Sequence, residues 1–149
     1  MDRQIAMDWA DLLESGKYPQ GEGALCANGK FCCLGVLSEM AVKAGIATKV
    51  ASDYTAAFSY QDVELSRPEI FEDDEPCPCC VSNDDDSYRD GSSGVLTNKI
   101  QEWAGMSDAN GTFPDNIKLG KYASLTAAND DGISFPVIAQ FIRENYESL

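Results

Sequence analysis

The chain has 149 residues, and its hydrophobic fraction of 44% is enough for one folded domain with its own core. Its 25 acidic and 11 basic side chains give a net charge of −14, which opposes unaided binding to DNA, RNA or an anionic membrane. The chain has no histidine, which excludes Ser-His-Asp and Cys-His catalysis and histidine-ligated metals. No apolar run approaches the roughly 20 residues of a membrane-spanning helix, and no secretory signal is visible, so a cytosolic protein is expected.

The first predicted element is an amphipathic helix over residues 2–15. Its apolar positions, Ile5, Trp9, Leu12 and Leu13, recur at helical spacing. Trp9 is predicted to be a core anchor, because a large aromatic ring on the apolar face of a helix usually packs inside.

A loop and a β-hairpin are expected next. Residues 17–23 contain two glycines and a proline, which favours a loop. Residues 24–26 and 31–32 are predicted to be short strands. Asn28-Gly29 between them is the sequence typical of a type I′ hairpin turn.

The element predicted to organise the fold is a helix over residues 31–44 that is apolar nearly all round. Ser38, Glu39 and Lys43 form its narrow polar strip, which is typical of a buried helix. Glu39 and Lys43 are four residues apart and are expected to pair, and Gly45 is expected to close the helix. The predicted fold class is therefore α+β, with four or five helices around this buried helix and a small β-hairpin or sheet.

Cys32 and Cys33 lie where the hairpin runs into this helix. A cysteine at a helix N-terminus can have a lowered pKa and act as a nucleophile. Such enzymes need a histidine partner, which this chain lacks. We therefore interpret both cysteines as small buried hydrophobic residues.

The second half of the chain is expected to hold three more helices and no nucleic-acid site. A possible strand at 54–60 precedes them. The helices are predicted over 96–104, over 122–129, and after Ser134, which is expected to cap the last helix. The last two helices resemble a helix-turn-helix, but beyond Lys121 one arginine faces five acidic groups, so DNA binding is not expected.

An acidic, cysteine-containing insertion is predicted at about 61–93 within a single domain of residues 1–149. Residues 61–90 hold eleven acidic and two basic side chains, a density typical of a solvated loop or arm. Cys77 and Cys80 have the spacing of half a zinc site, and Cys26 with Cys32 could supply the other two thiolates. Zinc, free thiols and a disulfide all stay open for these cysteines, and no cofactor is certain.

Four blocks of the sequence resemble a family of small, uncharacterised bacteriophage proteins. These are residues 9–20, the Phe-Cys-Cys-Leu-Gly-Val-Leu motif at 31–37, Trp-Ala-Gly at 103–105, and the Asn-Asp-x-Gly-x-Ser-Phe block within 125–139. The resemblance covers the two ends of the chain and leaves the middle unmatched.

The resemblance implies phage origin and action in the cytoplasm of the bacterial host. It brings no established activity, so no catalytic residues follow from it. This chain has Ser38 where the family pattern often has another cysteine, and Ala128 where it often has leucine. Small accessory phage proteins often counter host defences. This association suggests an anti-defence role but gives no mechanism for it.

The first functional hypothesis is an anti-defence protein that binds and sequesters a small host immune signal, such as a nucleotide-type second messenger. Its pocket would lie between the loop 17–23, the hairpin turn 28–30 and the turn 129–132. The candidate ligand-binding residues are Lys17, Tyr18, Lys30, Asn129 and Asp130.

Two alternatives come from other classes. The acidic arm at 64–90 could dock on a basic host defence enzyme or mimic a nucleic acid. Asp130 and Asp131 could serve a carboxylate- or metal-dependent hydrolase of a signalling nucleotide, although adjacent carboxylates after a helix are commoner as turn residues. The expected partners are thus a small-molecule signal or a host defence protein, with no membrane and a possible homo-oligomer.

Overall fold

The computed structural model describes residues 1–51, 57–63 and 94–149. These residues form an α+β fold with five α-helices, a short 3-10 helix and a four-stranded antiparallel sheet, as predicted. The helices are α1 (Arg3–Glu14), α2 (Cys33–Lys43), α3 (Asn98–Ala104), α4 (Leu125–Asp130), α5 (Phe135–Asn145) and η2 (Tyr146–Ser148). The strands are β1 (Cys26–Ala27), β2 (Lys30–Phe31), β3 (Ala47–Ala51) and β4 (Ala57–Asp62).

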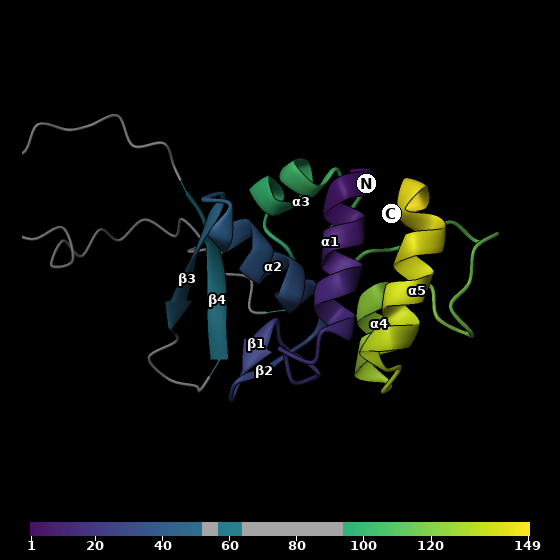
Figure 1. Ribbon diagram of the computed structural model, residues 1–149, viewed down its shortest axis with the longest axis horizontal. Coiled ribbons are helices and arrows are strands. Elements are labelled where there is room, and N and C mark those ends of the chain that lie inside the picture. The colour runs from purple at the N-terminus through teal and green to yellow at the C-terminus, as the bar shows by residue number, and fades with distance from the viewer. Residues whose placement is uncertain (52–56, 64–93) are drawn as a thin grey trace, which may run out of the picture.

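Helix α2 occupies the middle of the molecule. Figure 1 shows it between the sheet on one side and α1 on the other, with α4 and α5 beyond α1. Seven of its eleven residues are buried, which confirms the predicted central helix. It begins two residues later than predicted because Phe31 belongs to β2 and Cys32 is the N-cap. Gly45 has a φ of 74° and follows the helix in the left-handed conformation that favours glycine.

The predicted polar strip of α2 was partly wrong. Ser38 is fully buried, and its hydroxyl donates to the Leu34 carbonyl at 3.0 Å, so its polar group is satisfied inside the helix. Glu39 does not pair with Lys43. It accepts instead from the Lys49 ammonium at 2.5 Å and from the Tyr60 hydroxyl at 2.7 Å. Two strands that follow α2 in the chain therefore supply the partners that local spacing had assigned to the helix itself.

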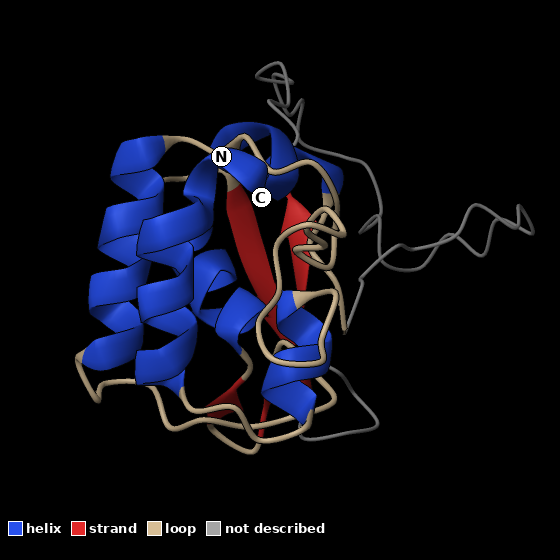
Figure 2. Cartoon of the chain, turned by 90° about the vertical axis from the view of Figure 1, so that its right-hand side faces the viewer, coloured by secondary structure: helices blue, strands red, loops and turns tan. Residues whose placement is uncertain are grey.

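Helices α1 and α5 pack side by side along their length (Figure 2). The Asp2 carboxylate caps α1 by accepting from two backbone N–H groups of its first turn. The Arg143 guanidinium on α5 lies 2.7 Å from both the Asp11 and the Glu14 carboxylates of α1. Trp9 is fully buried, which confirms it as a core anchor.

The sheet has the order β2-β1-β4-β3, and its first two strands form the predicted hairpin. Asn28 and Gly29 have φ of 52° and 73°, the left-handed pair that a type I′ turn requires. The strand expected at 54–60 is β4, shifted toward the C-terminus. Strand β3 was not predicted, because its pairing with β4 is the feature that makes it a strand.

The later helices lie close to their predicted positions. Helix α3 ends at Gly105, whose φ is 65°, and α4 begins three residues later than expected. The predicted insertion begins inside β4, and its residues from 64 onward, with Cys77 and Cys80, lie outside the described residues. Within the described parts of the chain, none of the helices combines the length and apolar character that crossing a bilayer requires.

Gly35 explains how the hairpin can lie against α2. A Cβ atom at this position would stand 1.7 Å from the Leu25 carbonyl oxygen, well inside van der Waals contact. The Leu25 carbonyl also accepts from the Cys32 N–H at 3.3 Å, so the backbone of the hairpin is held at this place. The glycine of the Phe-Cys-Cys-Leu-Gly motif is therefore required by packing.

Replacing Gly35 by alanine should lower the free energy of unfolding by about 2–3 kcal/mol, despite the better helix propensity of alanine. The reason is that the methyl group must push the Leu25 backbone away from α2. Urea denaturation followed by circular dichroism measures the change. Gly94→Ala is the matched control, because nothing lies within 4 Å of a Cβ built there, and it should change stability by less than about 0.5 kcal/mol. Equal stabilities of the two variants would contradict the packing role.

Candidate functional site

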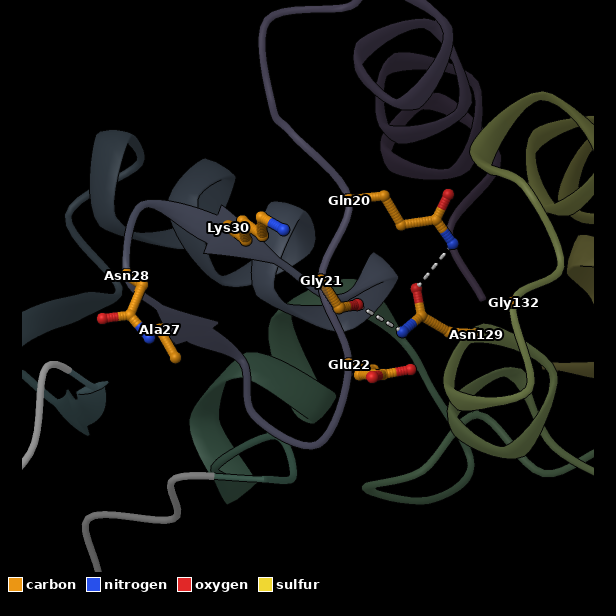
Figure 3. Close-up of a pocket in the computed structure, with 8 residues that line it drawn as sticks. All are labelled: Gln20, Gly21, Glu22, Ala27, Asn28, Lys30, Asn129 and Gly132. Atoms are coloured by element: carbon orange, nitrogen blue, oxygen red, sulfur yellow. Dashed lines mark hydrogen bonds between the residues drawn. The ribbon is translucent and has the colours of Figure 1, made fainter.

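Three segments that are far apart in the sequence meet around one pocket. They are the loop before β1, the β1–β2 hairpin and the turn between α4 and α5 (Figure 3). The pocket has a volume of about 480 Å³. Its lining residues are Gln20, Gly21, Glu22, Ala27, Asn28, Lys30, Asn129 and Gly132. These are the three segments that the sequence analysis expected to surround a ligand.

Asn129, at the end of α4, connects these segments from behind the pocket. Only 1% of it is exposed, and its amide makes four hydrogen bonds. The oxygen accepts from the Cys33 N–H at 3.1 Å and from the Gln20 amide at 3.3 Å. The nitrogen donates to the Gly21 carbonyl at 2.8 Å and to the Asp130 carboxylate at 3.2 Å. Since this uses all the hydrogen-bonding capacity of the amide, Asn129 positions the pocket wall.

Gln20 fastens the same loop to the start of α5. Its nitrogen donates to the Ile133 carbonyl at 2.7 Å, and its oxygen accepts from the Phe135 N–H at 3.1 Å. The Ser134 side chain makes no capping bond, so Gln20 takes over part of the capping of α5 from a distant part of the chain. Asp130 adds another tie by accepting from the Gly23 N–H at 3.0 Å.

The start of α2 lies directly beneath this network. The Cys33 carbonyl accepts from the Trp9 indole at 2.9 Å, and its thiol contacts the Leu125 carbonyl at 3.7 Å. The Cys32 sulfur caps α2 by accepting from the Gly35 N–H at 3.3 Å. Cys33 therefore joins α2 to α1 and α4, and Cys32 caps α2 itself.

Three lining side chains stay available to a ligand. Glu22, Asn28 and Lys30 are exposed, and none of their side chains has a hydrogen bond or an ion pair with another described residue. Figure 3 shows Lys30 and Asn28 on the hairpin and Glu22 on the adjacent loop, with the Asn28 amide pointing away from Glu22. The pocket thus combines one cation, one carboxylate and one amide on a frame that is already tied together.

The structure separates the five predicted ligand residues into two groups. Lys30 and Asn129 line the pocket, whereas Lys17, Tyr18 and Asp130 do not. The Tyr18 ring packs edge-on against Phe31 with centroids 5.0 Å apart, and its hydroxyl accepts from the Lys43 ammonium at 3.0 Å.

The sequence analysis named the segments of the pocket but did not list Gln20, Glu22 or Asn28 among its candidate ligand-binding residues. A polar side chain in a loop rich in glycine was the available signal. Such a side chain has no periodic pattern to show where it points.

The sequence matches the family model described as "Domain of unknown function (DUF8296)" over residues 1–146. The chain belongs to this family. The match includes every segment of the pocket and also the middle of the chain, which the resemblance had left unmatched. Neither the curated proteins nor the solved structures contain a match to it.

The paired carboxylates of this DUF8296 protein are engaged in separate contacts. Asp130 holds the loop and Asn129, as described above. Asp131 accepts from the Tyr122 hydroxyl and lies 3.0 Å from the Lys121 ammonium. These two hydrogen-bonding partners lower the pKa of the Asp131 carboxyl. Both acidic groups therefore behave as turn residues with structural partners.

The described cysteines of the DUF8296 chain are buried, as predicted for Cys32 and Cys33. Burial raises the pKa of the Cys32 thiol to about 11 and raises that of Cys33 well above its ordinary value. Burial also raises the pKa of Cys26. Among residues 1–51, 57–63 and 94–149, no three potential metal ligands cluster. The proposed zinc site depends on Cys77 and Cys80, which lie outside these ranges.

Replacing Asn129 by alanine should lower the free energy of unfolding by about 2–4 kcal/mol. The change leaves the Cys33 N–H and the Gly21 carbonyl without partners and detaches the loop from α4. Thermal and urea denaturation measure the loss, and Asn116→Ala, at an exposed position, is the matched control. An Asn129 variant as stable as the control would show that the four hydrogen bonds do not hold the loop.

Cys26, Cys32 and Cys33 should resist alkylation in the native protein at pH 7.5, because their thiols are buried and protonated. Iodoacetamide labelling with peptide mass spectrometry, before and after unfolding in urea, measures this resistance. Full labelling is expected only in urea. Rapid native labelling of Cys32 would contradict its burial and would reopen the interpretation of this cysteine as a nucleophile.

Proposed function

We propose that this protein binds and sequesters a small anionic signal of the nucleotide type, acting as a phage anti-defence protein in the bacterial cytoplasm. The observation that carries the proposal is the pocket itself. Three distant segments form it, internal hydrogen bonds hold its walls, and Lys30, Glu22 and Asn28 are left available. A site with this division of roles is suited to binding.

The tied frame lowers the cost of binding. A loop that must become ordered around a ligand loses conformational entropy, and this loss reduces affinity. Here the loop is already fixed to β2, because the Gly21 N–H donates to the Phe31 carbonyl and the Phe31 N–H donates to the Pro19 carbonyl, both at 2.8 Å. Asn129 and Gln20 fix its other side. Sequestration requires tight binding, which such pre-organisation favours.

The size and charge of the pocket support a nucleotide-sized ligand. Small-molecule sites commonly have volumes of roughly 300–1,000 Å³, and this pocket has about 480 Å³. Lys30 is the cation among the lining residues and can donate charge-assisted hydrogen bonds to a phosphate. The net charge of −14 repels anions at long range, so a local cation is needed to retain one.

The side chains near the pocket support binding of the signal over its chemical conversion. The sequence resemblance supports action for a phage. The Asp130 and Asp131 carboxylates have structural partners, and the described thiols are buried with raised pKa values. A bound signal would therefore be held without being altered. The resemblance to bacteriophage proteins supplies the biological setting, in which removing a host immune signal has a clear benefit.

The proposal is tested by calorimetric titration of the whole protein with guanosine and adenosine monophosphates and cyclic dinucleotides. At least one of these ligands should bind, and Lys30→Met should weaken its binding by roughly 10- to 100-fold, because a charge-assisted contact to phosphate is lost. Lys17→Met makes the same change of charge at the start of the pocket loop, at a residue that does not line the pocket, and should leave affinity nearly unchanged. No heat with any ligand, or equal losses in the two variants, would overturn the proposal.

A further inference from the structure

The polar side chains that line the pocket are of two kinds: some hydrogen-bond to other described residues, and others do not. The side-chain amides of Gln20 and Asn129 form hydrogen bonds with the loop, with α2 and with the start of α5. The Glu22 carboxylate, which can only accept when ionised, and the Lys30 ammonium, which can only donate, are not used by any described residue. They also form no ion pair with each other. A complementary ligand therefore carries an anion at one end and hydrogen-bond donors at the other.

The backbone segments that carry Glu22 and Lys30 lie against each other, one in the loop and the other in the hairpin. Gly21 lies between them, and a Cβ atom there would stand 2.7 Å from the Lys30 Cβ, so the two backbones are in direct contact. Beside this contact, the Gly21 N–H donates to the Phe31 carbonyl and the Phe31 N–H donates to the Pro19 carbonyl, which holds the loop against β2. Glu22 and Lys30 therefore face the pocket from adjacent segments that cannot separate freely (Figure 3).

The chemistry of the bases distinguishes among nucleotides at such a site. A carboxylate offers two acceptors side by side and matches two adjacent donors. Guanine presents such a pair, N1–H and N2–H, on its Watson–Crick edge. Adenine and cytosine each present one amino donor beside a ring-nitrogen acceptor, and uracil presents one N–H between two carbonyl oxygens. An unpaired carboxylate therefore favours guanine and leaves the other bases with a repulsive contact.

We propose that the pocket selects a guanine nucleotide, with Glu22 accepting from N1–H and N2–H of the base and Lys30 holding the phosphate. This inference rests on the proposed function and adds the identity of the base. This assignment explains why a pocket that binds an anion contains a carboxylate: Glu22 contacts the base, and Lys30 contacts the phosphate.

The test exchanges the hydrogen-bonding pattern of residue 22 while keeping its shape. The wild-type protein should bind guanosine monophosphate about tenfold or more tightly than adenosine monophosphate in calorimetric titrations. Glu22→Gln presents one acceptor and one donor, which is the complement of adenine. This variant should bind guanosine monophosphate about tenfold more weakly and adenosine monophosphate more tightly. The ratio of the two dissociation constants should then approach one or reverse.

Two further variants distinguish guanine selection from nucleotide binding itself. Glu144→Gln removes the same charge from the exposed face of α5 and should leave the base preference unchanged. Lys30→Met should weaken both nucleotides alike, because it acts on the phosphate. Equal binding of both nucleotides by the wild type, with no effect of Glu22→Gln, would overturn guanine selection and leave the nucleotide function standing. Binding of neither nucleotide, nor of any cyclic dinucleotide, would overturn both.

Discussion

The amide of Asn129 is the interaction on which the rest of the site depends. It lies in the core, where an unpaired amide is costly, and it satisfies all its hydrogen bonds with groups from α2, the loop and its own helix. One of these, the Cys33 N–H, belongs to the first turn of the central helix, where backbone donors lack partners within the helix. The same residue thus satisfies the start of α2 and fixes the wall of the pocket.

The Phe-Cys-Cys-Leu-Gly motif gains a physical meaning from this arrangement. Cys32 caps α2. The Cys33 N–H donates to the Asn129 oxygen, and the Cys33 carbonyl accepts from the Trp9 indole. Gly35 leaves room for the Leu25 carbonyl. Each position serves the packing of one helix against its neighbours. The lining side chains without partners among the described residues lie elsewhere, in the less regular loop and hairpin, where binding residues are commonly found.

Some polar side chains therefore hold the fold together through hydrogen bonds, and others have no partner among the described residues and could contact a ligand. A carboxylate on α2, Glu39, is of the first kind, because it holds Lys49 and Tyr60 of the sheet. Desolvation and the Glu39 carboxylate raise the pKa of Tyr60, which keeps its hydroxyl protonated as a donor. Glu22 is also a carboxylate but has no such partner among the residues that the structure describes, and this contrast makes it a candidate for ligand recognition.

The sequence by itself determined the helices, the Asn28-Gly29 turn and the buried character of α2, because periodicity and turn preferences act over a few residues. It also indicated the three segments around the pocket, since glycine, proline and asparagine mark the turns where loops form. Only the tertiary structure decided that β3 pairs with β4, that Glu39 bonds to Lys49, and that Asn129 meets Cys33 across 96 positions of the chain. Such partners depend on how the elements pack, and no local pattern records that packing.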